Sequence, residues 1–140
     1  MGIEIEYFDL ERSGLASNSR LLIYYRKIRE MQQRTVSINV PLAKLLMDVK
    51  PKRRTMQLER LFNQVLSELP DGVIIRDIDV MFHPDYKVDV LKILVEARRH
   101  KVYSVQWPGT KKDGKLIYSE EGYPDYRVFE IKDYDVTCVI

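Results

Sequence analysis

The sequence predicts an α/β fold in which helices cover a mainly parallel β-sheet. Through residue 107, strand-like segments alternate with segments of helical periodicity, which is the pattern of β-α-β units. Residues 73–75 are hydrophobic at every position, as in a strand that helices cover on both faces. The 140 residues contain no Gly/Ser-rich linker or repeat, so residues 1–140 are expected to form a single domain.

The strands are predicted from alternating or continuous hydrophobic runs. Residues 3–8 alternate Ile and Tyr with Glu, and residues 35–40 form a β-branched run that Pro41 ends. We predict that residues 3–8, 35–40, 73–80 and 102–107 lie parallel in one sheet with helices on both faces. Residues 115–119 and 126–131 are expected to pair as a C-terminal hairpin, followed by a short strand at residues 136–139.

The helices are predicted from hydrophobic stripes. A short helix is expected at residues 42–48, before a basic loop around Pro51. Thr55 is expected to cap a longer helix that ends before Pro70. Residues 91–100 complete the set, with basic residues in the last turn, where they suit the helix dipole.

Residues 21–31 allow two interpretations. Their hydrophobic residues recur at helical spacing, and Ser19 is of a type that caps helices, which favours a helix. The alternative is a strand at residues 21–25, because that run is partly aromatic and β-branched.

Composition excludes several classes of protein. The 23 basic and 21 acidic residues give a net charge of +2, so no overall field indicates binding to nucleic acid or membranes. One cysteine, Cys138, cannot form an internal disulfide, and with two histidines it offers too few ligands for structural zinc. Cys138 is expected in the core.

No run approaches the roughly 20 apolar residues of a membrane span, and an acidic N-terminus is unlike a signal peptide. We expect a cytoplasmic protein without a membrane partner.

One segment resembles a phosphate-binding loop only in its spacing. Gly109, Gly114 and Lys115 match Gly-x-x-x-x-Gly-Lys, but Leu116 replaces the hydroxyl residue. A strand-like run follows, whereas phosphate binding needs a helix N-terminus at that point. We therefore predict that Lys115 lies at the base of a hairpin and binds no phosphate.

A second segment has a better predicted position, between the first strand and the helix favoured at residue 21. Residues 14–21 read Gly-x-x-x-x-Ser-Arg-Leu. Ser19 replaces a glycine, Arg20 keeps the cation of the usual lysine, and Leu21 cannot bind magnesium. At a helix start, Gly14, Ser19 and Arg20 could contact an anion weakly.

A carboxylate at the end of a buried strand is the second part of such a nucleotide site. Here Arg76 occupies the expected acidic position after residues 73–75, and Asp77 and Asp79 are displaced from it. Asp77 could serve if the register shifts by one residue. A solvated pair of aspartates at a strand end is the equally good alternative.

Together these segments resemble a known family, the small P-loop proteins of BREX bacteriophage-exclusion systems (BrxF). The resemblance covers most of the chain from residue 14 onwards. It is carried by Ser-Ile-Asn-Val-Pro-Leu at 37–42, Val-Ile-Ile-Arg-Asp-Ile-Asp-Val-Met-Phe-His-Pro at 73–84, Lys-Val-Asp at 87–89, Gln-Trp-Pro-Gly at 106–109, and the hairpin at 114–118 and 122–127. It implies a three-layer P-loop NTPase-like domain, of the RecA/AAA-like kind, that acts in phage defence.

Both nucleotide motifs depart from the family pattern, so we expect an interaction component that does not hydrolyse ATP. Expected partners are other proteins of the defence system. No catalytic residue, metal or cofactor is expected, beyond weak anion or ATP binding at Gly14, Ser19, Arg20 and Asp77. Two alternatives stay open: a residual ATP-binding protein or ATPase, and an accessory factor whose Lys52, Arg53 and Arg54 contact DNA phosphates.

Overall fold

A parallel sheet forms the centre of the molecule. The computed structural model describes residues 1–13, 20–25 and 35–140. Six strands pair in the order β1-β9-β2-β5-β4-β3, and every neighbouring pair is parallel. They are β1 (Ile3–Ile5), β2 (Leu21–Tyr24), β3 (Thr35–Ser37), β4 (Val73–Arg76), β5 (Tyr103–Gln106) and β9 (Val136–Val139). The α/β class and the parallel arrangement of the four predicted strands are confirmed.

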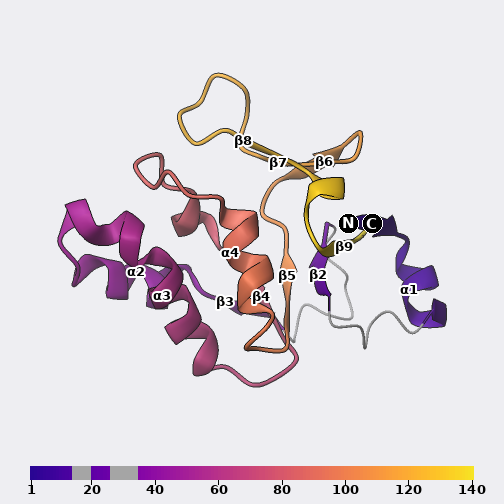
Figure 1. Cartoon of the computed structure of the whole chain (residues 1–140), viewed down its shortest axis with the longest axis horizontal. Coiled ribbons are helices and arrows are strands. Elements are labelled where there is room, and N and C mark those ends of the chain that lie inside the picture. Colours follow the sequence, from indigo (N-terminus) through magenta and orange to yellow (C-terminus); the bar gives the residue numbers. More distant parts are fainter. Residues whose placement is uncertain (14–19, 26–34) are drawn as a thin grey trace.

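Helices contact both faces of the sheet. The helices α2 (Asn39–Met47), α3 (Arg54–Ser67) and α4 (Val90–Ala97) share one hydrophobic core with strand residues such as Ile75 and Val105. On the other face, Leu10 of α1 (Tyr7–Ser13) packs with Leu22 and Ile74. Figure 1 shows α2, α3 and α4 gathered together, with α1 at the opposite side near both chain ends. Alternation along β4 therefore places Ile74 and Ile75 in different hydrophobic layers.

The helix favoured from residue 21 is wrong, and the strand interpretation is confirmed. Leu21–Tyr24 is β2, hydrogen-bonded between β9 and β5. All four residues are buried, with Leu21 exposed for 1% and Ile23 for 0% of their surface. A central strand covered on both faces is hydrophobic at every position, so alternation does not reveal it. Residues 28 and 31 of the predicted helix lie outside the described residues.

Four predicted boundaries also shift. The strand predicted at residues 3–8 ends at Ile5, and helix α1 begins at Tyr7. Helix α2 already begins at Asn39 and contains Pro41, because proline is tolerated in the first helical turn. Thr55 is the second residue of α3 and not its cap; its hydroxyl donates to the Asp85 carbonyl at 3.3 Å. Strand β4 ends at Arg76 instead of residue 80, and a short 3₁₀ helix, η4 (Asp79–Phe82), follows.

The C-terminal hairpin is confirmed and is part of a three-stranded antiparallel sheet. Its strands are β6 (Thr110–Lys112), β7 (Lys115–Tyr118) and β8 (Arg127–Glu130). Asp113 and Gly114 both have positive φ, 50° and 75°, as a two-residue hairpin turn of type I′ requires. Lys115 begins β7 opposite Lys112, so its predicted place at the base of a hairpin is confirmed.

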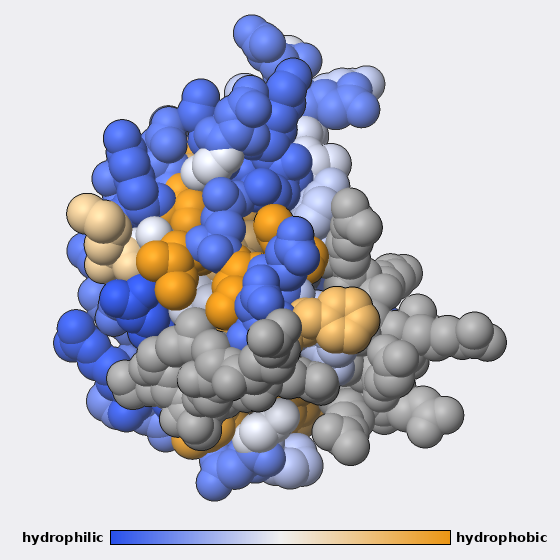
Figure 2. Space-filling model, turned by 90° about the vertical axis from the view of Figure 1, so that its right-hand side faces the viewer, coloured by the Kyte–Doolittle hydropathy of each residue, from blue (hydrophilic) through white to orange (hydrophobic). Residues whose placement is uncertain are grey.

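The edge of the sheet beside α1 exposes hydrophobic surface. Figure 2 shows hydrophobic side chains at the centre of this side of the molecule, with hydrophilic ones above them and to their left. Phe8 of α1 is exposed for 75% of its surface, and Ile3 of the edge strand β1 for 40%. Elements β1 and α1 therefore bury only part of their hydrophobic side chains.

We expect Thr137→Val to stabilise the protein by about 1 kcal/mol, because an unpaired buried hydroxyl costs free energy that a methyl group does not. Thr137 is fully buried in β9, and its hydroxyl has no hydrogen-bond partner among the described residues. Urea denaturation monitored by fluorescence of Trp107, the only tryptophan, measures the change. Thr110→Val, at an exposed position of β6, is the control. A destabilised Thr137→Val protein would show that the hydroxyl makes a stabilising interaction.

Candidate functional site

Ligands of open α/β sheets bind beyond the carboxyl ends of the strands, so this end of the parallel sheet is the candidate location of a site. Asp77 lies there, directly after β4. Its φ of 54° is in the left-handed region, which aspartate tolerates better than most residues but which few non-glycine residues adopt. The turn at Asp77 ends the strand and directs the chain into η4.

Asp77 is paired with a neighbouring cation. The Arg76 guanidinium lies 2.5 Å from the Asp77 carboxylate, and both side chains are a little over 40% exposed. Arg76 Nε also donates to the Thr35 hydroxyl of β3 at 3.1 Å. Arg76 thus holds Asp77 against the edge strand, and magnesium binding by Asp77 would require this ion pair to open.

Arg20 lies at the opposite end of the sheet, where the strands begin. It directly precedes β2, and its guanidinium contacts Asp135 at 3.1 Å and donates to the Met1 carbonyl at 2.7 Å. No helix begins at residue 21, so the anion-binding helix N-terminus predicted for Arg20 is wrong. Gly14 and Ser19 lie outside the described residues.

The structure therefore does not bring Arg20 and Asp77 together. Leu22 is level with Ser104, and Ser104 is level with Ile74, in strands that all run the same way. Arg20 is two residues before this level and Asp77 three residues after it, which separates them by about 16 Å along the strands. The two half-motifs belong to opposite ends of the sheet.

The segment after Asp77 attaches the small antiparallel sheet to the main body. The Tyr118 hydroxyl of β7 donates to Asp79 at 2.8 Å, and the Val80 amide donates to the Asn39 side chain of α2 at 2.9 Å. Burial and the bond to Asp79 raise the pKa of Tyr118 well above that of free tyrosine, so it stays a neutral donor. Residues of η4 are thus fixed from both sides.

An aromatic cluster reinforces this attachment. Phe82 of η4 stacks on Tyr118 with ring centroids 3.9 Å apart and meets Trp107 edge-on at 5.8 Å. The ring of Phe129 in β8 completes the cluster. The Trp107 indole donates to the Ile117 carbonyl at 3.1 Å. Gly109 is required nearby, because a Cβ there would lie 1.9 Å from that same carbonyl oxygen.

The basic residues proposed to contact DNA do not act alike. Lys52 and Arg53 are exposed in η3 (Pro51–Arg53). Arg54 Nε instead donates to the carbonyls of Leu46 and Val49, at 2.8 and 3.0 Å. These carbonyls lie at the C-terminal end of α2, where a cation is favourable. Arg54 therefore joins α2 to α3.

We expect Arg54→Ala to lower the free energy of unfolding by about 1.5–3 kcal/mol, because two carbonyls at the end of α2 lose a charged donor. Urea denaturation measures the loss. Arg53→Ala, which removes an exposed cation one residue away, should change stability by no more than about 0.5 kcal/mol. Equal effects of the two substitutions would contradict a structural role specific to Arg54.

Cys138 is fully buried, as expected, and burial raises its pKa to about 12, so the thiol is protonated at neutral pH. No group of three or more His, Cys, Asp or Glu side chains that could hold a metal ion occurs among the described residues. Within residues 1–13, 20–25 and 35–140, no helix has the length and hydrophobicity to cross a membrane.

Sequence reasoning missed a groove between α3 and α4, which has a volume of about 330 Å³. Thr55, Met56 and Glu59 line it from α3, and Lys92, Ile93 and Glu96 from α4. Both helices are recognisable from their periodicity, and their lining residues recur at helical spacing. Which faces of the two helices meet depends on the sheet order, and no local pattern contains that information.

A scan against protein-family models, a search of curated proteins and a search of solved structures found no match.

Proposed function

We propose that this chain is a P-loop NTPase-like protein-interaction component of a bacterial BREX-type anti-phage defence system, and that it acts without hydrolysing ATP. The observation that carries the proposal is the separation of the two nucleotide half-motifs, with Arg20 at the amino end and Asp77 at the carboxyl end of the strands of one parallel sheet. A nucleotide site needs its phosphate loop and its carboxylate together at the carboxyl ends of the strands.

The strand order supports a P-loop NTPase-like origin. Five of the strands lie in the order β9-β2-β5-β4-β3. In this set β2 comes first in the sequence and lies between β5 and β9, which come last, as in RecA- and AAA-like sheets. The chain leaves β2 for the far edge at β3 and then returns strand by strand. Such an order places a crevice at the carboxyl ends of the central strands, where ligands of open α/β sheets bind.

The segments that could form a phosphate loop support the loss of hydrolysis. The loop of this motif follows a strand, is rich in glycine and precedes a helix. No glycine occurs in residues 25–34 after β2, at residue 38 after β3, or in residues 77–89 after β4. The carboxylate of Asp77 is meanwhile bound to Arg76.

Exposed hydrophobic surface supports a role in protein interaction. Phe8 of α1 and Met56 of α3 are exposed for 75% and 80% of their surface, and these two helices pack on opposite faces of the sheet. Large exposed side chains of this kind occur singly on most proteins, but here one of them lines a groove.

The first experiment is a titration with ATP by isothermal calorimetry, with and without magnesium, combined with a phosphate-release assay. We expect no magnesium-dependent binding and no turnover. ATP hydrolysis that Asp77→Ala or Arg20→Ala abolishes would overturn the proposal and establish the ATPase alternative.

The second experiment measures phage plating on bacteria that carry a complete BREX system. Deleting the gene for this chain should abolish protection, and the wild-type gene should restore it. Arg76→Ala and Asp77→Ala should restore it equally well, because an interaction component does not use them to bind magnesium. Protection that survives the deletion would contradict a role in defence.

The DNA-contacting alternative is tested by duplex binding at several salt concentrations. Because Arg54 donates hydrogen bonds to carbonyls at the end of α2, the candidates for phosphate contacts are Lys52 and Arg53. Their double replacement by alanine should flatten the logarithmic salt dependence by about two units if both bind phosphate. Tight binding at physiological salt that this variant loses would favour the alternative.

A further inference from the structure

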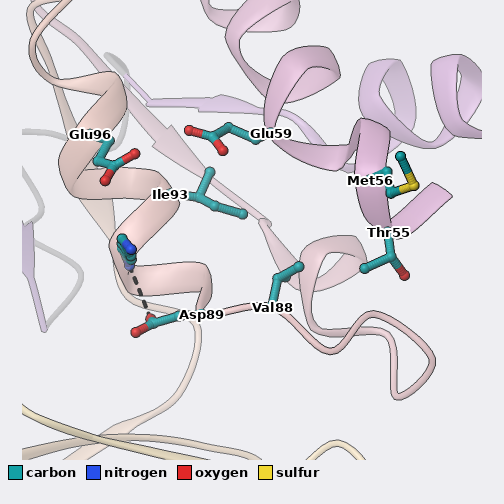
Figure 3. Close-up of a pocket in the computed structure, with 8 residues that line it drawn as sticks. Thr55, Met56, Glu59, Val88, Asp89, Ile93 and Glu96 are labelled. Atoms are coloured by element: carbon teal, nitrogen blue, oxygen red, sulfur yellow. Dashed lines mark hydrogen bonds between the residues drawn. The ribbon is translucent and has the colours of Figure 1, made fainter. Parts of the chain in front are cut away.

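The groove between α3 and α4 has a hydrophobic floor and acidic sides. Figure 3 shows Glu59 of α3 and Glu96 of α4 extending toward one another, with Ile93 between the two helices. Ile93 is 6% exposed, whereas Met56 is exposed for 80% of its surface at one end of the groove. Val88 lies near the middle, in the segment that leads into α4. Hydrophobic contact area and negative charge therefore occur together.

The two glutamates have no ionic partner within the described part of the chain, where neither forms a salt bridge. Asp89, the third acid of the groove, is already bound. It caps α4 by accepting from the Lys92 amide at 3.0 Å, and it accepts from the Tyr134 hydroxyl at 2.7 Å. Asp89 thus shapes the groove, while Glu59 and Glu96 leave their carboxylates available.

We propose that this groove docks a segment of a partner protein in which an arginine or lysine lies next to a large hydrophobic side chain. The cation would lie between Glu59 and Glu96, and the hydrophobic side chain would cover Ile93 and Met56. This inference rests on the proposed interaction function and names the chemistry of one partner surface.

The charge of the groove selects this occupant. Three acidic side chains and one lysine line it, so the net charge is −2 and a nucleic-acid backbone is repelled. A purely hydrophobic segment would leave both carboxylates desolvated without a partner, which is costly. A cation beside a hydrophobic anchor satisfies both requirements.

The probe is a library of random twelve-residue peptides displayed on filamentous phage and selected on the immobilised protein. We expect enrichment of peptides with Arg or Lys within four positions of Leu, Ile, Phe, Met or Trp. The best peptide, synthesised with a fluorescein label, should bind Glu59→Gln/Glu96→Gln at least about tenfold more weakly by fluorescence anisotropy, since both charge contacts are lost. Met56→Ser should weaken it by a similar factor.

The matched control is Glu68→Gln/Glu120→Gln, which neutralises two exposed acids outside the groove and should leave the affinity unchanged. Thermal denaturation verifies that every variant is folded. Three outcomes would overturn the inference: no enrichment above a blank surface, peptides that bind the groove double variant equally well, or self-association of the wild-type protein that this variant abolishes. The last would identify a second copy as the occupant.

The phage-plating assay distinguishes failure of this inference from failure of the proposed function. Peptide binding with unchanged protection by Glu59→Gln/Glu96→Gln would support the site and separate it from defence. Protection by the wild-type gene with no enrichment of peptides would support the function and reject the site.

Discussion

Phe82→Ala is expected to lower the free energy of unfolding by about 3–5 kcal/mol, the range measured for large aromatic side chains in cores. Phe82 is 2% exposed and lies at the centre of the aromatic cluster. Its ring contacts Tyr118, Trp107 and Phe129, which come from different parts of the chain. Removing the ring leaves a cavity between the small antiparallel sheet and η4, which neighbouring rings cannot fill without leaving their own contacts.

Urea denaturation with tryptophan fluorescence measures this loss, and hydrogen exchange shows where it acts. The amides of β7 should lose more protection than those of β4, because Phe82 holds the antiparallel sheet against the main body. Tyr123→Ala is the matched control, since that aromatic side chain is 60% exposed. A Phe82→Ala protein as stable as this control would show that the aromatic cluster does not attach the sheet.

Several elements could be predicted because their signal is local. The hydrophobic stripe of α3 recurs along 14 residues, long enough to exclude a strand. The strand-like residues 116–119 predict that Lys115 lies in a hairpin. In the structure Asp113 and Gly114 form the turn that precedes it. Such patterns depend on neighbours in the sequence, and tertiary contacts did not override them.

The positions of Arg20 and Asp77 relative to one another could not be predicted, because they depend on the order of the strands in the sheet. Residues 21–24 are hydrophobic throughout, and a four-residue run of this kind has no periodicity that distinguishes strand from helix. Because these residues form a central strand, Arg20 lies at the amino end of that strand, where it pairs with Asp135. The left-handed turn at Asp77 was equally hidden, since it follows from the path into η4.

Leu21→Ser is expected to lower the free energy of unfolding by about 3–5 kcal/mol, because it removes a buried side chain and introduces a hydroxyl without an assured partner. Leu21 is 1% exposed and lies level with Val136 of the adjacent strand. In the phosphate-loop register suggested by the sequence, the same substitution would supply the missing magnesium ligand at an exposed helix start. The two interpretations thus predict opposite results.

The thiol of Cys138 gives a sensitive measurement of this difference. It is fully buried and its pKa is raised to about 12, so alkylation requires opening of the core. Leu21→Ser should accelerate alkylation about a hundredfold or more, as the open state becomes more populated. Arg20→Lys, which keeps the charge beside Asp135, should change the rate by less than about tenfold. Unchanged alkylation together with magnesium-dependent ATP binding by Leu21→Ser would restore the phosphate-loop register, because only an exposed residue 21 accepts serine without loss of stability.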